Sequence, residues 1–222
     1  MVSGTIFSDW GQQLPQLLPG FVAALKLTGL SLLVGFPLGL LFALMVMSSR
    51  RAIKGVGLAL VELGRGVPLL VLLELVYFGM PELHLTVTQL ASAVIGFGWS
   101  TGAYASETVR ASLEAVPRGQ RDAAEAVGFG NLDSFRFVIF PQAVRIAIPP
   151  LMNTAIYVFQ GTSLAFVIAY PEIMSRAYEQ GSETFEYLSI FILAACMYAA
   201  ISLPATLFVG VVERYLGRHL AR

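Results

Sequence analysis

The chain has 222 residues, of which 56% are hydrophobic and 13% are charged, and its formal net charge is zero. This composition excludes a disordered chain and is unusual for a soluble domain, in which roughly half of the residues are apolar and a quarter are charged. The lack of a basic excess argues against a nucleic-acid partner. The length fits a single domain over residues 1–222.

Long apolar runs predict an all-α integral membrane protein. A helix needs about 20 largely apolar residues to cross the hydrocarbon layer of a membrane. We expect five transmembrane helices, at about residues 18–47, 56–79, 87–109, 144–170 and 185–212. In the first of them, small residues recur at near-helical spacing and favour close contact with a neighbouring helix: Gly29, Ser31, Gly35 and Gly39.

Lysine and arginine are distributed unequally between the two sets of predicted loops. Eleven lie on one side: Arg50, Arg51, Lys54, Arg110, Arg118, Arg121, Arg136, Arg145, Arg214, Arg218 and Arg222. Arg176 lies on the other side, and Lys26 lies near that end of its span. Because short cytoplasmic loops are enriched in these residues, we expect loop 111–143 and the C-terminus in the cytoplasm and the N-terminus outside.

Residues 117–141 form the longest charged interruption and predict a helical hairpin. Pro117 suits the start of a helix, and Gly128 suits a left-handed stop at its end. Asn131 can cap a second helix that runs to about Phe140, with Pro141 as its far boundary. The surface of the first helix could fit a groove on another protein, although a plain connecting hairpin is the alternative. The residues expected to contact such a partner are Arg121, Asp122, Ala123, Ala124, Glu125, Gly128 and Pro141.

This hairpin resembles the cytoplasmic "EAA" loop of ABC-importer permease subunits. The family pattern is Glu-Ala-Ala, a Gly, and then Ile-x-Leu-Pro. Here Asp122 stands for the Glu, Val138 for the Ile and Phe140 for the Leu, while Gly128 and Pro141 match. The surrounding residues, such as those at 102–104 and 114–120, resemble the branch that imports polar amino acids. The similarity covers about residues 25–215.

The resemblance implies a permease subunit in a bacterial inner (plasma) membrane. A second permease subunit, identical or related, would complete the pathway for a polar amino acid or related compound. A cytoplasmic ATPase would dock on the hairpin, and an external solute-binding protein would deliver the substrate. The chain has no phosphate-binding loop, so we expect it to be no enzyme and to bind no cofactor, with ATP and Mg on the partner ATPase.

Ionisable residues within membrane spans are costly and are candidates for function. Glu62 and Arg65 share a helix face and could form a structural or gating pair. Glu74 has no charged neighbour one turn away, so it could meet a cationic group of the substrate, or be protonated or bonded to another helix. Glu107 is expected to pair with Arg110 or Arg65. An ion-coupled secondary carrier that uses Glu74 and Glu107 is the alternative function, although the internal repeats common in such carriers are not evident.

The fourth span carries further polar candidates for the substrate pathway: Asn153, Gln160, Thr162 and Ser163. The segment from Gln160 to Ser163 resembles a family motif that begins with Lys. Its hydroxyl groups could bond back to the helix or line a polar path. The next loop, residues 171–186, is either solvated or a short helix that faces an external binding protein.

Overall fold

The computed structural model describes residues 9–217. Every regular element in that range is helical, which confirms the expected all-α fold. In chain order the elements are α1 (Trp10–Val46), α2 (Arg51–Gly66), α3 (Leu69–Glu82), α4 (Gln89–Glu114), α5 (Arg118–Ala126), α6 (Asn131–Asp133), the π-helical η1 (Ser134–Ile139), α7 (Phe140–Gly161), the 3₁₀-helical η2 (Thr162–Ile168), α8 (Ile173–Thr184) and α9 (Tyr187–Gly217).

Three helical segments in the described range are long and apolar enough to cross a membrane: α1, the run Asn131–Ile168 and α9. The bent pair of α2 and α3 makes a fourth if the two helices form one span. α4 has 26 residues but is less apolar, because other helices rather than lipid surround much of it. Ten of its eleven buried residues are Gly, Ala, Ser or Thr. A five-span topology therefore stays a prediction.

The contact between α1 and α4 is the most extensive in the fold, and it depends on glycine. A methyl group at Gly35 would lie 2.6 Å from the Thr101 Cβ, and one at Gly39 would lie 2.6 Å from the Ala105 Cβ. The predicted close approach is therefore confirmed at these two positions. It is wrong for Gly29, where nothing lies within 4 Å of the corresponding position. α1 also begins earlier than expected, at Trp10 rather than near residue 18.

The second predicted span, residues 56–79, is broken rather than continuous. α2 ends at Gly66, α3 begins at Leu69, and their axes differ by 105°. Pro68 has no N–H to continue the helical ladder, and its ring forces the preceding residue out of the helical region. Val67 accordingly has an extended backbone, with φ −87° and ψ 130°.

The fourth predicted span, residues 144–170, is part of a longer rod, Asn131–Ile168. Pro141 does not end the second hairpin helix as expected, because it lies in the first turn of α7. η1 precedes it, and its wider π-helical turns accommodate a proline that cannot donate a ladder hydrogen bond. Asn131 is also not a cap but the first helical residue, since Gly130 occupies the cap position.

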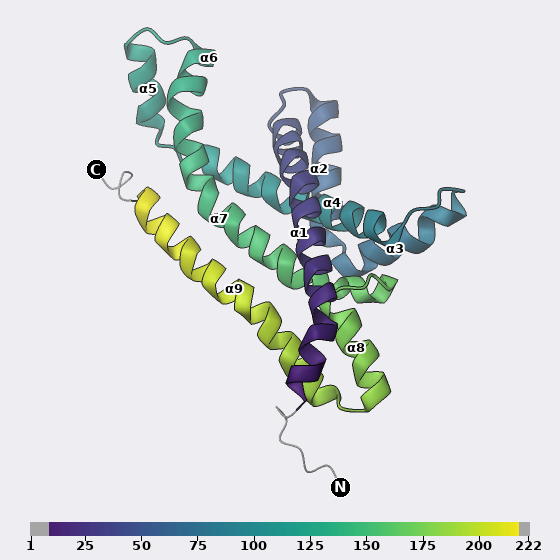
Figure 1. Cartoon of the computed structure of the whole chain (residues 1–222). Coiled ribbons are helices and arrows are strands. Elements are labelled where there is room, and N and C mark those ends of the chain that lie inside the picture. The colour runs from purple at the N-terminus through teal and green to yellow at the C-terminus, as the bar shows by residue number, and fades with distance from the viewer. Residues whose placement is uncertain (1–8, 218–222) are drawn as a thin grey trace.

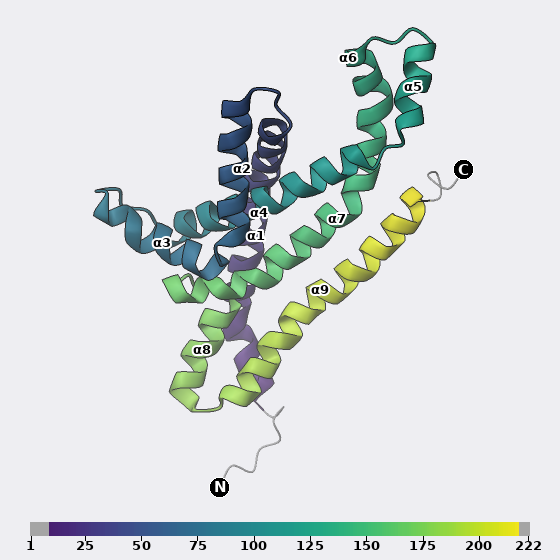
Figure 2. The same cartoon turned by 180° about the vertical axis from the view of Figure 1, so that it is seen from behind.

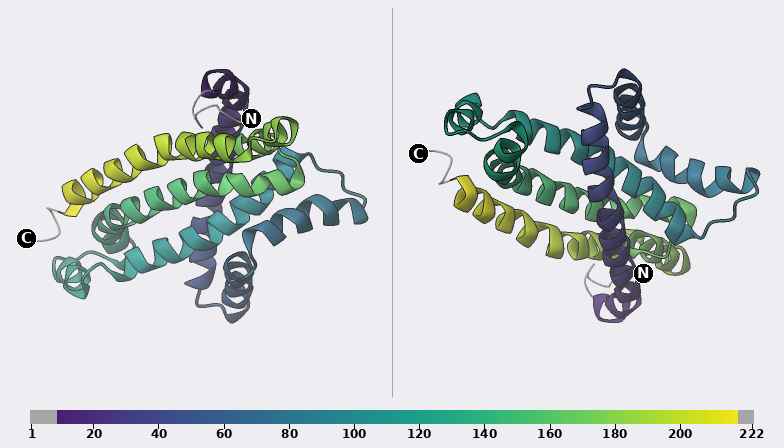
Figure 3. Two further views of the ribbon diagram at one scale, coloured as in Figure 1. Left: turned by 90° about the horizontal axis from the view of Figure 1, so that it is seen from below. Right: turned by 90° about the horizontal axis from the view of Figure 1, so that it is seen from above.

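The helices separate the molecule into two ends (Figures 1 and 2). The α5–α6 hairpin and the α1–α2 turn lie at one end, and the start of α1 and α8 lie at the other. α4, α7 and α9 lie side by side while α1 crosses them (Figure 3). Of the basic residues used to predict orientation, Arg218 and Arg222 lie outside the described residues.

Candidate functional site

The predicted hairpin forms as a short helix, a tight turn and the start of a long helix (Figure 1). Gly128 has φ +90°, which confirms the left-handed stop expected there. Its N–H donates to the Glu125 carbonyl at 3.0 Å, and the Phe129 N–H donates to the Ala124 carbonyl at 3.0 Å. These bonds close the C-terminus of α5 and fix the direction in which the chain turns.

α5 packs against η1, and its Ala124 is buried. The other predicted contact residues of α5 are exposed: Arg121, Asp122, Ala123 and Glu125. Two apolar side chains at the end of the hairpin are also largely exposed, Val127 at 73% and Leu132 at 77%. The hairpin stands away from the other helices at this end (Figures 1 and 2). A protruding tip with apolar and charged groups is suited to contact with another protein.

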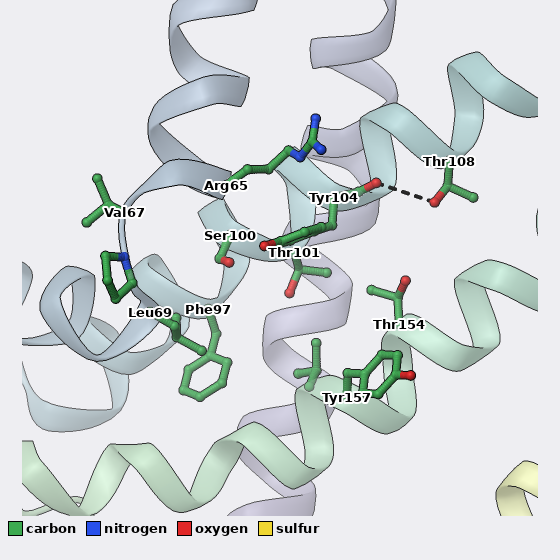
Figure 4. A pocket seen from close by; sticks show the side chains of 12 residues that line it. Arg65, Val67, Leu69, Phe97, Ser100, Thr101, Tyr104, Thr108, Thr154 and Tyr157 are labelled. Carbon is green, nitrogen blue, oxygen red and sulfur yellow. Dashed lines mark hydrogen bonds between the residues drawn. The ribbon is translucent and has the colours of Figure 1, made fainter.

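A cavity of about 470 Å³ opens between the α2–α3 break, α4 and α7 (Figure 4). This volume is within the range of about 300–1,000 Å³ that is usual for small-molecule sites. Apolar side chains, among them Leu69, Phe97 and Val158, form one part of its wall. Hydroxyl groups form most of the rest: Ser100, Thr101, Tyr104, Thr108, Thr154 and Tyr157.

Arg65 is the one charged residue among the described residues that line this cavity. Its Nη1 lies 3.7 Å from the Glu107 Oε2, too far for a hydrogen bond. The same carboxylate oxygen accepts from Arg110 at 2.8 Å, and Arg110 also donates to Glu114 at 2.8 Å. The Arg65 guanidinium stands 5.7 Å from the centre of the Tyr104 ring, within cation–π range.

The predicted pairing of Glu107 is therefore found, mainly with Arg110. The proposed pair of Glu62 and Arg65 does not form in the described structure, since Glu62 is exposed and has no ion pair. Glu74 is exposed on α3 beside Val71 and lies outside the cavity. The two carboxylates of the ion-coupled alternative, Glu74 and Glu107, thus share no site.

The polar candidates of the fourth span do not line the cavity either. Asn153 and Gln160 are exposed elsewhere on α7. The hydroxyl groups of Thr162 and Ser163, at the start of η2, donate to the carbonyls of Phe159 and Gln160 at the end of α7, at 2.7 and 2.9 Å. The sequence left two alternatives for these hydroxyls, a hydrogen bond to the backbone or a place along a polar pathway. The structure shows the hydrogen bond to the backbone.

Sequence reasoning missed most of the hydroxyl groups in the cavity. A signal for them does exist, because Ser100, Tyr104 and Thr108 are spaced by four residues and so share one face of α4. Thr154 and Tyr157 are three apart and share a face of α7 in the same way. Which of these faces meet around one cavity depends on how the two helices pack. Within residues 9–217, no three His, Cys, Asp or Glu side chains are grouped as a metal site requires.

Glu172 is a second group whose role the sequence does not reveal. It belongs to the loop expected to be solvated or helical, yet its side chain is fully buried. Its carboxylate caps α8, accepting from the N–H groups of Met174 at 2.8 Å and Ser175 at 2.7 Å. The Tyr198 hydroxyl also donates to it at 2.6 Å and so connects α8 with α9. Burial raises the pKa of Glu172 to about 7, although these hydrogen bonds oppose the shift.

The family model described as "Binding-protein-dependent transport system inner membrane component" matches residues 35–218. The chain belongs to this family. It is a multi-pass membrane protein and a permease subunit of an ABC importer.

Similar permeases cover nearly the whole chain. The L-cystine transport system permease protein TcyB of Bacillus subtilis is 39% identical over 94% of this chain and 89% of its own length. The probable amino-acid ABC transporter permease protein YckA of the same organism is 32% identical over 91% of this chain and 90% of its own length. A crystal structure of an amino acid ABC transporter with histidines contains a chain with a TM-score of 0.91 and 31% identity, which covers 96% of this permease and 99% of that chain.

Proposed function

We propose that two permease subunits of this kind, identical or paralogous, enclose a pathway through which a polar amino acid or a related compound crosses the inner membrane. The proposal is supported by the amino-acid transport named for the similar permeases and for the similar solved structure. The cavity beside Arg65 is the part of this chain best suited to contact the substrate. ATP and Mg bind to a separate ATPase, and an external solute-binding protein supplies the amino acid.

The membrane topology in this proposal has five spans, with α4 as the third. α4 is about 39 Å long at 1.5 Å per residue, which is enough to cross a hydrocarbon layer of about 30 Å. The hairpin and the α1–α2 turn lie at the same end of the molecule. Arg50 lies in that turn, and Arg51 and Lys54 lie in the first turn of α2. The rule that places lysine and arginine in the cytoplasm puts that end inside the cell.

The proposed coupling mechanism rests on one continuous helical segment that joins the hairpin to the cavity. The helical run Asn131–Ile168 begins in the hairpin and includes Thr154 and Tyr157 in the cavity wall. The rise between residues 131 and 157 is about 39 Å at 1.5 Å per residue. When the ATPase moves the hairpin, this rod moves as a rigid body and changes the cavity.

The proposal is tested by uptake into liposomes that contain the permease, its ATPase and the binding protein. We expect uptake to require ATP and the ATPase. Uptake that an ion gradient drives in the absence of the ATPase would contradict the proposal and favour a secondary carrier.

Gly128→Leu tests the hairpin itself. A side chain in the left-handed conformation costs about 1–2 kcal/mol, so the turn should change while the helices stay intact. Gly130→Leu is the matched control, because Gly130 has φ −71° and nothing lies within 4 Å of its Cβ position. We expect normal membrane insertion for both variants, and lost ATPase association or lost uptake only for Gly128→Leu. Equal coupling in the two variants would reject the docking role of this turn.

A further inference from the structure

Another cavity, here called the lateral groove, lies on the other side of α4 from the cavity beside Arg65. It has a volume of about 250 Å³, and its walls are formed by α1 from Phe36 to Met47, the last turns of α4, and η1 and α7 from Phe135 to Leu151. Leu113 in this groove is nine residues from Tyr104 in the first cavity, which is about 180° around a helix of 3.6 residues per turn. The two cavities are therefore separate sites.

The lateral groove is apolar, and it is open at the surface of two membrane-spanning segments. Ser112 is the one polar residue among the described residues that line it. Leu44 on α1 is 57% exposed, and Phe140 on α7 is 46% exposed. The lining stretch of α1, residues 36–47, rises about 17 Å at 1.5 Å per residue, close to half of a hydrocarbon layer about 30 Å thick. The groove thus has the depth of one leaflet, where lipid acyl chains are the available apolar groups.

At the hairpin end, the lateral groove adjoins a charged pocket of about 600 Å³. Met47, Leu113 and Phe135 line both cavities and so join them. Arg118 and Arg121, one turn apart on α5, also line the charged pocket. Neither arginine forms an ion pair within the described residues. A guanidinium group with free donors is suited to bind a phosphate through parallel hydrogen bonds.

Two carboxylates line the charged pocket as well, but only one of them is free. Glu114 accepts a hydrogen bond of 2.8 Å from Arg110, which neutralises its charge. Asp122 forms no ion pair in the part of the chain that the structure describes. The two free guanidinium groups of α5 therefore outnumber the one free carboxylate. This excess of positive charge favours a phosphate group.

Ser112 is an independent observation at the place where the two cavities meet. It precedes Leu113, which lines both of them. Its side chain is only 3% exposed, and its hydroxyl forms no hydrogen bond within residues 9–217. On the same helix, the buried hydroxyl of Ser106 donates to the Ala103 carbonyl at 2.7 Å. A buried hydroxyl without a partner is costly, and an ester carbonyl of a phospholipid, which lies between the acyl chains and the phosphate, would supply an acceptor.

We propose that a phospholipid binds here, with an acyl chain in the lateral groove, an ester carbonyl at Ser112 and its phosphate at Arg118 and Arg121. Basic pockets between transmembrane helices on the cytoplasmic side are suited to lipid head groups. The leaflet is the one on the hairpin side, which the topology of the proposed function makes cytoplasmic. Because α1, α4 and α7 form the groove and α5 contributes to the pocket, the bound lipid joins the hairpin to the membrane helices.

Native mass spectrometry of the detergent-purified permease–ATPase complex tests the proposal by titration with three probes. Dioleoylphosphatidylglycerol has both recognised groups, dioleoylglycerol has the same chains without the phosphate, and inorganic phosphate has no chains. We expect saturable binding of the phospholipid and binding of dioleoylglycerol that is about 10-fold weaker or more, because the charge-assisted hydrogen bonds are lost. Inorganic phosphate should not displace the phospholipid, because it gains nothing from the apolar groove.

Arg118→Gln should weaken phospholipid binding about fivefold, the usual effect of one basic residue near an anionic lipid. Arg136→Gln is its matched control, because Arg136 is an exposed arginine of the same hairpin that lines neither cavity. Leu44→Asn should also weaken binding, because an amide replaces an apolar contact of the acyl chain. Leu41→Asn is its control, since Leu41 is 50% exposed on the same helix and lies outside the groove. Ser112→Ala should weaken binding of the phospholipid and of dioleoylglycerol alike, because both have the ester carbonyl.

Equal binding of dioleoylglycerol and the phospholipid, displacement by inorganic phosphate, or unchanged affinity in an Arg118→Gln complex that gel filtration shows to be intact would overturn the inference. Absence of saturable phospholipid binding to the intact wild-type complex would overturn it as well. The proposed function is judged separately, by uptake into liposomes. A wild-type complex that imports an amino acid but fails the lipid test refutes this inference alone, and a complex that binds the lipid but imports no amino acid with its binding protein present refutes the proposed function alone.

Discussion

Glu172 offers a sharp test of the buried contact between α8 and α9. Its carboxylate is fully buried and accepts three hydrogen bonds, from two N–H groups of α8 and from the Tyr198 hydroxyl. Glu172→Gln removes the charge and keeps the shape, and the amide oxygen can still accept from Tyr198. The variant has no titrating carboxyl group, so its stability should not depend on pH at this site, although its amide NH2 cannot accept the cap hydrogen bond that one carboxylate oxygen accepts.

The sign of the pH dependence follows from the pKa shift. Burial raises the pKa of Glu172 from 4.5 to about 7, so the folded state holds a proton that the unfolded state releases. The stability from this proton is fully present below about pH 4.5 and is lost as the pH rises to about 7. At about 1.4 kcal/mol per pKa unit, the loss is about 3 kcal/mol.

Thermal unfolding of the detergent-purified permease between pH 5 and 8 measures this effect. We expect the wild type to lose several degrees in Tm over this range and Glu172→Gln to stay nearly constant. Glu183→Gln removes an exposed carboxylate from α8 and should keep the wild-type slope. Parallel curves for the wild type and Glu172→Gln would refute the assignment of this pH dependence to Glu172.

Two further predictions concern packing and docking. Gly39→Leu should destabilise the permease by about 1–3 kcal/mol, because its Cβ alone would lie 2.6 Å from the Cβ of Ala105. Gly29→Leu, on the same helix, meets open space and should leave thermal unfolding nearly unchanged. Leu132→Asp should leave Tm unchanged, because this side chain is 77% exposed, and should lower ATPase affinity by about 10-fold or more in pull-down titrations. Asn131→Asp adds the same charge one residue away, and an equal loss in that variant would show that charge alone, and not the apolar contact, is responsible.

Properties that depend on neighbouring residues could be predicted from the sequence. The helical fold follows from long apolar runs, and the turn at Gly128 follows from the one residue type that accepts φ +90° without strain. The break at Pro68 was not predicted, because apolar residues on both sides of it favoured one continuous span. Neither Pro141 nor the prolines at 149 and 150 break their helix, so a proline alone does not decide where a helix ends.

By itself, the sequence determined the all-helical fold, the hairpin and the family, because hydrophobic length, glycine conformation and motif spacing are local properties. Only the tertiary structure decided that Arg65, Thr101 and Tyr157 share one cavity, that Glu62 forms no ion pair within residues 9–217, and that Glu172 is buried against Tyr198. The physical reason is that these relations depend on which helix faces meet and at what angle. Close approach at Gly35 and Gly39 and the 105° bend at Pro68 set those angles, and they join residues that are far apart in the chain.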